Sequence, residues 1–126
     1  MKLFHATWPS RLEDIMCDGL QHGTYFAGHP GHAAAFMALK PGELVGFKDI
    51  VIDGATHTIP DVIVHDECVV LAVDTAKLFG PALRRSYDHA ADQFPDDLEC
   101  WQYRLLVPPE HIQPLYRLNI REAIGR

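Results

Sequence analysis

Short apolar runs separated by turn residues dominate the pattern of this chain. Leu3–Thr7 and Gly23–Ala27 predict two buried strands, each of which carries one functional side chain, a histidine or a tyrosine, among apolar or small neighbours. The segment Cys68–Val73 is continuously apolar and rich in β-branched residues, which predicts a strand in the interior of a sheet. Two further strands are predicted at Glu99–Val107 and Leu115–Ile120.

Three helices are predicted, over residues 10–18, about 32–39 and 81–94. The first has an apolar stripe at helical spacing. Ser10 and Glu13 have the spacing of a capping box, and Gly19 stands where a left-handed residue closes a helix. The second is rich in alanine, and the third begins at Pro81, a residue favoured in the first helical turn.

The middle of the chain, residues 43–66, has a less regular pattern. Its strand-like pieces, Ile50–Ile52 and Val62–Val64, flank the turn dipeptide Asp53-Gly54, so we expect an irregular hairpin or flap. Strands outnumber helices and mostly follow one another, which is typical of the α+β class. The 126 residues suit a single domain with its own core.

Composition and charge argue against several kinds of function for this protein. The net charge of −6 argues against a broad phosphate-binding surface, because nucleic-acid binders usually carry a basic patch. The three cysteines have no CxxC spacing, which fits free thiols in a reducing, cytoplasmic compartment. We see no signal peptide and no apolar run near the ~20 residues that cross a bilayer, so no membrane partner is expected. The histidine spacings do not match a four-ligand zinc site, and no metal is expected.

The order of the elements carries more information than any single motif. A strand with His5, a helix closed by Gly-Leu, a strand with Tyr25 and then an alanine-rich helix resembles the start of the ADP-ribosyltransferase fold. Phe-His-Ala-Thr around His5 is similar to a Tyr-His-Gly-Thr motif of the diphtheria-toxin and poly-ADP-ribose-polymerase group, and Phe36 lies eleven positions after Tyr25, where that group has an aromatic residue. The resemblance implies one ADP-ribosyltransferase-like domain over residues 1–126, with a split antiparallel β-sheet core, flanking helices and NAD in the cleft between the half-sheets.

The resemblance also implies roles for individual residues. His5, in the motif that Thr7 completes, holds the ribose hydroxyls on the adenosine side of NAD, and Tyr25 stacks on the nicotinamide ring. Phe36 completes the aromatic sandwich. Each of these residues also has a structural interpretation: His5 can be satisfied by a backbone carbonyl at a sheet edge, and the two aromatic residues can belong to the core.

The third member of the family's His-Tyr-Glu triad is where this sequence departs from the pattern. The family has Glu-Tyr at the start of a late strand, and the matching dipeptide here is Gln102-Tyr103. Glu99 is the nearest carboxylate, three residues earlier. Gln102 is favoured by alignment and Glu99 by chemistry, because a carboxylate stabilises the developing cation and an amide does not. Both are candidate catalytic residues.

The function implied by the resemblance is mono-ADP-ribosyl transfer from NAD to a protein or nucleic-acid acceptor. Small single-domain forms resemble toxins of toxin–antitoxin pairs and phage effectors, so an antitoxin or a target protein is a possible partner. Three alternatives stay open: a catalytically inactive binding protein of the same fold, an NAD glycohydrolase, and an RNA 2′-phosphotransferase. The last ranks lower because the acidic chain has few basic residues to bind a phosphate.

Overall fold

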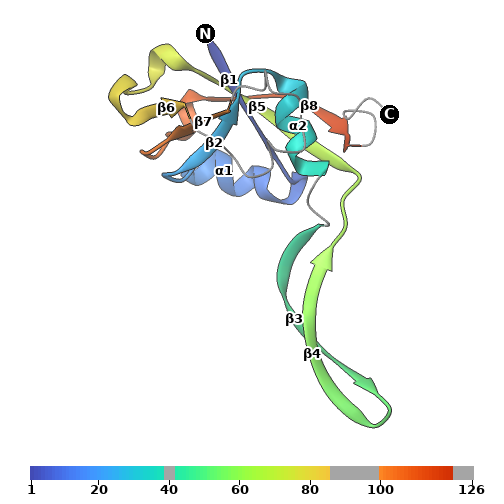
Figure 1. Ribbon diagram of the computed structural model, residues 1–126. Coiled ribbons are helices and arrows are strands. Elements are labelled where there is room, and N and C mark those ends of the chain that lie inside the picture. The colour runs from blue at the N-terminus through green and yellow to red at the C-terminus, as the bar shows by residue number, and fades with distance from the viewer. Residues whose placement is uncertain (39–41, 86–99, 121–126) are drawn as a thin grey trace.

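The computed structural model describes residues 1–38, 42–85 and 100–120 of the chain. They form a six-stranded antiparallel sheet, two short helices and a separate two-stranded hairpin (Figure 1). The strands of the sheet lie in the order β6-β7-β2-β1-β5-β8. The predicted α+β class is therefore confirmed. Among the described helices, none is long and apolar enough to cross a membrane.

The bounds of the elements follow from the backbone pairing. The large sheet contains β1 (Lys2–Thr7), β2 (Thr24–Ala27), β5 (Glu67–Asp74), β6 (Leu83–Arg85), β7 (Cys100–Tyr103) and β8 (Ile112–Asn119). The helices are α1 (Leu12–Asp18) and α2 (Pro30–Ala38). The hairpin consists of β3 (Glu43–Ile52) and β4 (Ala55–Ile63), joined by a turn in which Asp53 and Gly54 have positive φ.

Apolar side chains fill both faces of the sheet. The α1-side cluster, against which Leu12, Ile15 and Met16 of α1 pack, contains Leu3, Leu20, Phe26, Val69, Leu71, Val73, Ala82, Tyr103, Val107 and Ile112. The α2-side cluster contains Ala6, Trp8, Ala27, Ala33, Ala34, Met37, Cys68, Val70 and Ile120. Successive residues of β5 join opposite clusters, which explains its unbroken apolar run and confirms the predicted interior strand.

Around the first helix, the structure corrects one detail of the prediction. Residues Pro9–Arg11 form a 3₁₀ helix, and α1 starts only at Leu12. The predicted capping box is wrong, because the Ser10 hydroxyl donates to the Glu43 carboxylate instead of capping the helix. Gly19 does close α1, with φ of 84° and its N–H bonded to the Ile15 carbonyl.

Later elements also differ in extent from the prediction. The helix α2 starts at Pro30, two residues before its predicted start at about residue 32, because proline suits the first helical position. Pro81 opens only a 3₁₀ turn, and Leu83–Arg85 pair with β7 as an edge strand, so the predicted helix is wrong there; its remainder, residues 86–94, lies outside the described residues. The strand predicted over 99–107 ends at Tyr103, since Val107 pairs instead with Leu20.

The sheet is nearly divided between β1 and β2. Only Phe4 and Ala27 are paired across this boundary, whereas β1 pairs with β5 over its whole length. The sheet therefore has two halves, β6-β7-β2 and β1-β5-β8, which diverge beyond Phe4. This divergence shapes the candidate site.

Candidate functional site

A pocket of about 390 Å³ lies at the end of β1, beside α1 and the start of β2. His5 and Thr7 line it from β1, Asp14 and Asp18 from α1, and Thr24 from β2. Its volume falls within the range of roughly 300–1,000 Å³ found for ligand sites. The local sequence explains the position: the chain passes from β1 into the 3₁₀ turn and α1, then returns through Gly19 to β2 along the same edge of the sheet.

The pocket is lined by residues from both sides of the sheet. Ala6 and Met37 belong to the α2-side cluster, yet they line the pocket together with Leu20 and Ile15 of the α1 side. This is possible because β1 and β2 separate after the Phe4–Ala27 pair. A ligand in this pocket would contact backbone and side chains of both half-sheets.

His5 connects the half-sheets where they diverge. Its Nδ1 lies 2.8 Å from the Tyr25 carbonyl oxygen, and its ring meets Phe26 edge-on with 5.9 Å between the ring centroids. His5 is thus bonded to a backbone carbonyl, as its structural interpretation predicts. The same bond orients the ring at the pocket wall.

Tyr25 and Phe36 lie on the other side of the sheet from His5. Because Phe4 faces Ala27, side-chain alternation places Tyr25 on the α2 side, away from His5. Tyr25 is 41% exposed and so does not belong to the core. Phe36 packs, partly buried, against the α2-side cluster. The structure thus brings His5 and Thr7 together at the pocket, while neither Tyr25 nor Phe36 lines it.

Gln102 is one of the two candidate catalytic residues, and it lies directly opposite Tyr25 in the β2–β7 pair. Its side-chain amide donates to the Gly23 carbonyl oxygen at 3.2 Å, which holds the turn that leads into β2. Glu99, the other candidate, lies outside the described residues. The described part of the site therefore brings an amide, and not a carboxylate, beside Tyr25.

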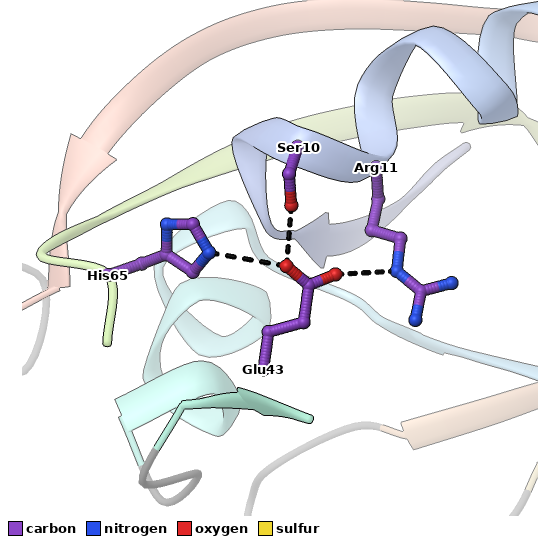
Figure 2. Close-up of polar contacts among 4 residues, drawn as sticks. All are labelled: Ser10, Arg11, Glu43 and His65. Carbon is purple, nitrogen blue, oxygen red and sulfur yellow. Dashed lines mark hydrogen bonds and ion pairs between the residues drawn. The ribbon is translucent and has the colours of Figure 1, made fainter. Parts of the chain in front are cut away.

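A polar cluster that the sequence analysis did not predict surrounds Glu43 at the start of β3 (Figure 2). Ser10 Oγ donates to Glu43 Oε1 at 2.6 Å, and Arg11 Nε donates to Oε2 at 2.7 Å. His65 Nε2 lies 3.3 Å from Oε1. These partners come from 22 to 33 residues away in the sequence, so no local spacing signals them.

This cluster links the pocket wall to the base of the hairpin. Arg11 and Trp8 line the pocket, and the Trp8 ring stacks on His65 with 5.1 Å between the centroids. Glu43 itself is buried. The Ser10 hydroxyl bond holds the pKa of the Glu43 carboxyl below its ordinary value of 4.5, and Arg11 and His65 act in the same direction against the opposing effect of burial.

We expect Glu43→Gln to destabilise the protein at neutral pH by about 1–3 kcal/mol, because hydrogen bonds to a charged acceptor are lost. The folded-state pKa is lowered, so the carboxylate contributes its full stability above pH 4.5 and loses it as the pH falls through the folded-state pKa. Urea unfolding across acidic and neutral pH should therefore show the variant and wild type converging in acid.

The matched control for this experiment is Glu67→Gln, because Glu67 is exposed and its nearest cation, Arg117, lies 4.0 Å away. Its effect should be small at every pH, as for other surface ion pairs. A stability difference between Glu43→Gln and wild type that stays constant down to strongly acidic pH would contradict the assigned role of the Glu43 charge.

The sequence matches no protein-family model and no curated protein, and the fold matches no solved structure. Function therefore has to be inferred from the chemistry of the site itself.

Proposed function

We propose that this protein is a mono-ADP-ribosyltransferase that binds NAD in the pocket and transfers ADP-ribose to a macromolecular acceptor. The observation that carries the proposal is the pocket at the point where the two half-sheets diverge, with His5 bonded across the gap to the Tyr25 carbonyl. A split sheet with a ligand in the split is the arrangement that the resemblance to ADP-ribosyltransferases implies.

In this proposal, NAD spans both sides of the sheet. The adenosine-side ribose lies on the α1 side, where His5 and Thr7 line the pocket. We place the nicotinamide ring on the α2 side, where the exposed side chain of Tyr25 can stack on it. The partly buried Phe36 lies on the same side, in α2. The separation of His5 from Tyr25 thus corresponds to the two ends of one dinucleotide.

Arg11 is the cation best placed for the pyrophosphate. Its Nε bonds to Glu43, which orients the guanidinium, and the side chain is exposed at the pocket wall. The remaining N–H groups of a guanidinium suit phosphate oxygens in geometry and charge. Asp14 and Asp18 line the pocket from α1 and would repel a phosphate, so the pyrophosphate is expected on the Arg11 side.

Thermal unfolding with NAD tests the binding half of the proposal. At a hundredfold excess over Kd, a ligand specific for the folded state adds about 2.7 kcal/mol of stability, or roughly 10 °C for a domain of this size. Tyr25→Ala should remove most of this shift while changing the melting temperature of the unliganded protein little, because the ring is 41% exposed. Tyr116→Ala is the matched control, since Tyr116 is 43% exposed on β8.

The absence of any NAD or ADP-ribose shift in folded wild type would overturn the proposal. So would an equal loss of the shift in the Tyr116 variant. Incubation with NAD and a cell lysate then distinguishes transfer to an acceptor from hydrolysis of NAD. Released nicotinamide with a labelled acceptor supports transfer, whereas nicotinamide released without a label indicates an NAD glycohydrolase.

A second function, NAD binding without turnover, is favoured by one specific observation. The Gln102 amide is engaged with the Gly23 carbonyl and carries no charge to stabilise a cationic ribose. Wild-type protein that shows the thermal shift but releases no nicotinamide with any acceptor would support this second function over the first.

A further inference from the structure

Two carboxylates stand on the wall that α1 contributes to the pocket. Asp14 and Asp18 both line the pocket, and both side chains are exposed. They are four residues apart, so they lie on one face of the helix with about 6 Å between their Cβ atoms. Neither carboxylate forms a hydrogen bond or an ion pair with another residue in the described part of the chain. Their oxygen atoms are therefore open to a ligand, and when ionised they can only accept hydrogen bonds.

The charges of this wall follow a fixed order along the chain. Arg11 directly precedes α1, and Asp14 and Asp18 come after it within the helix. At a rise of ~1.5 Å per residue, Asp14 lies about 4.5 Å and Asp18 about 10 Å beyond Arg11 along the helix axis. The 2.7 Å bond from Arg11 Nε to Glu43 turns the guanidinium toward the start of β3. The pocket therefore has a cationic end, and beyond it a wall that accepts hydrogen bonds and repels anions.

A dinucleotide has matching chemistry in the same order. Its pyrophosphate is anionic, and the adenosine-side ribose next to it carries two neighbouring hydroxyls that donate hydrogen bonds. A carboxylate beside that ribose accepts from the 2′-hydroxyl of NAD. NADP has a phosphate in place of this hydroxyl, which removes the donor and adds a charge of about −1.5 to −2 at pH 7. The two dinucleotides therefore differ at the position where the pocket wall carries its carboxylates.

We propose that Asp14 and Asp18 restrict this pocket to dinucleotides whose adenosine-side ribose is unphosphorylated, so that it binds NAD and rejects NADP. The inference rests on the proposed binding of NAD and adds to it the choice between these two dinucleotides. In NADP, the 2′-phosphate would face two carboxylates of the same sign of charge, and such like-charge contacts select against the wrong partner. In NAD, the same carboxylates receive hydrogen bonds from the ribose.

The test is the ratio of the dissociation constants for NADP and NAD, measured by calorimetric titration of the full chain at low salt. Because the two ligands differ only in the 2′-phosphate, the ratio cancels the contacts that they share. Wild type should bind NADP at least about tenfold more weakly than NAD. Asp14→Asn and Asp18→Asn should each narrow this difference. The double variant should bind both ligands within about threefold, because asparagine keeps an acceptor oxygen without the charge.

Glu13→Gln is the matched control. Glu13 lies in the same first turn of α1 as Asp14 and is exposed, but it does not line the pocket. The substitution removes the same charge from the same helix turn, so the ratio should stay at its wild-type value. Asp14, Asp18 and Glu13 are all exposed, so each variant should melt close to the wild-type temperature without ligand.

Equal affinity of wild type for NAD and NADP would overturn this inference and leave the proposed NAD binding standing. A wild-type ratio that persists in the double variant would also overturn it, because exclusion by shape does not depend on the two charges. A narrowing in Glu13→Gln as large as that in Asp14→Asn would assign the effect to the net charge of the chain instead. Wild type that binds neither dinucleotide would overturn the proposed function, and this inference with it.

Discussion

If the proposed transfer depends on a carboxylate, Glu99→Gln is expected to lower the rate of nicotinamide release by about 10²–10³ while leaving NAD affinity nearly unchanged. Breaking the bond between nicotinamide and ribose leaves positive charge on the ribose in the transition state. A carboxylate stabilises that charge more than it stabilises bound NAD, and the loss of one such electrostatic contact costs about 10²–10³ in rate. Single-turnover release of nicotinamide, combined with NAD titration, measures the two effects separately.

Gln102 provides the complementary measurement. If this residue occupies the family's acid position, Gln102→Glu should raise nicotinamide release and Gln102→Ala should abolish it. The Gly23 bond predicts a second effect of Gln102→Ala, a modest loss of stability of about 1 kcal/mol, since one neutral hydrogen bond disappears. Glu67→Gln, at an exposed carboxylate on β5, should change neither rate nor affinity. Unchanged release in both the Glu99 and Gln102 variants would exclude both as the third triad residue.

The sequence predicted correctly those segments whose own residues indicate their conformation. The run Cys68–Val73 indicated a strand buried on both faces, and β5 lies between β1 and β8 with its side chains in both clusters. The dipeptide Asp53-Gly54 predicted a hairpin, and both residues have positive φ in a two-residue turn. In each case the local pattern and the tertiary environment favour the same conformation.

Predictions failed where a distant partner decides the structure. Ser10 had the local spacing of a cap, but the buried Glu43 carboxylate, 33 residues away, offers its hydroxyl a charged acceptor. Leu83–Arg85 had a helical pattern after Pro81, but pairing with β7 satisfies their backbone as a strand. The positions of His5 and Tyr25 on opposite faces of the sheet, which follow from the Phe4–Ala27 pair, were not predicted at all. Register of this kind is set by tertiary pairing and leaves no local signal.

Gly19→Ala is expected to cost about 2–4 kcal/mol of folding stability and to weaken NAD binding with it. Gly19 has φ of 84° and ψ of −177°, a region of backbone space that is essentially restricted to glycine. A Cβ at this position would also collide with the Val107 carbonyl oxygen. The backbone would have to move, and the two 2.9 Å bonds between Leu20 and Val107 would be strained or lost. Denaturant unfolding measures the loss, and the NAD-induced thermal shift reports on the pocket wall.

Gly54→Ala separates the two causes of the loss in Gly19→Ala, which are backbone strain at positive φ and the collision with the Val107 carbonyl oxygen. Gly54 also has positive φ, at 80°, but no atom lies within 4 Å of the position that a Cβ would occupy. The alanine there should cost only about 1–2 kcal/mol of local conformational strain, confined to the turn between β3 and β4. If the Gly19 and Gly54 variants unfold at the same denaturant concentration, the collision with Val107 adds nothing to the loss of stability in Gly19→Ala. If only Gly19→Ala loses the NAD shift, the close approach of Gly19 to Val107 is what holds the α1–β2 wall of the pocket in place.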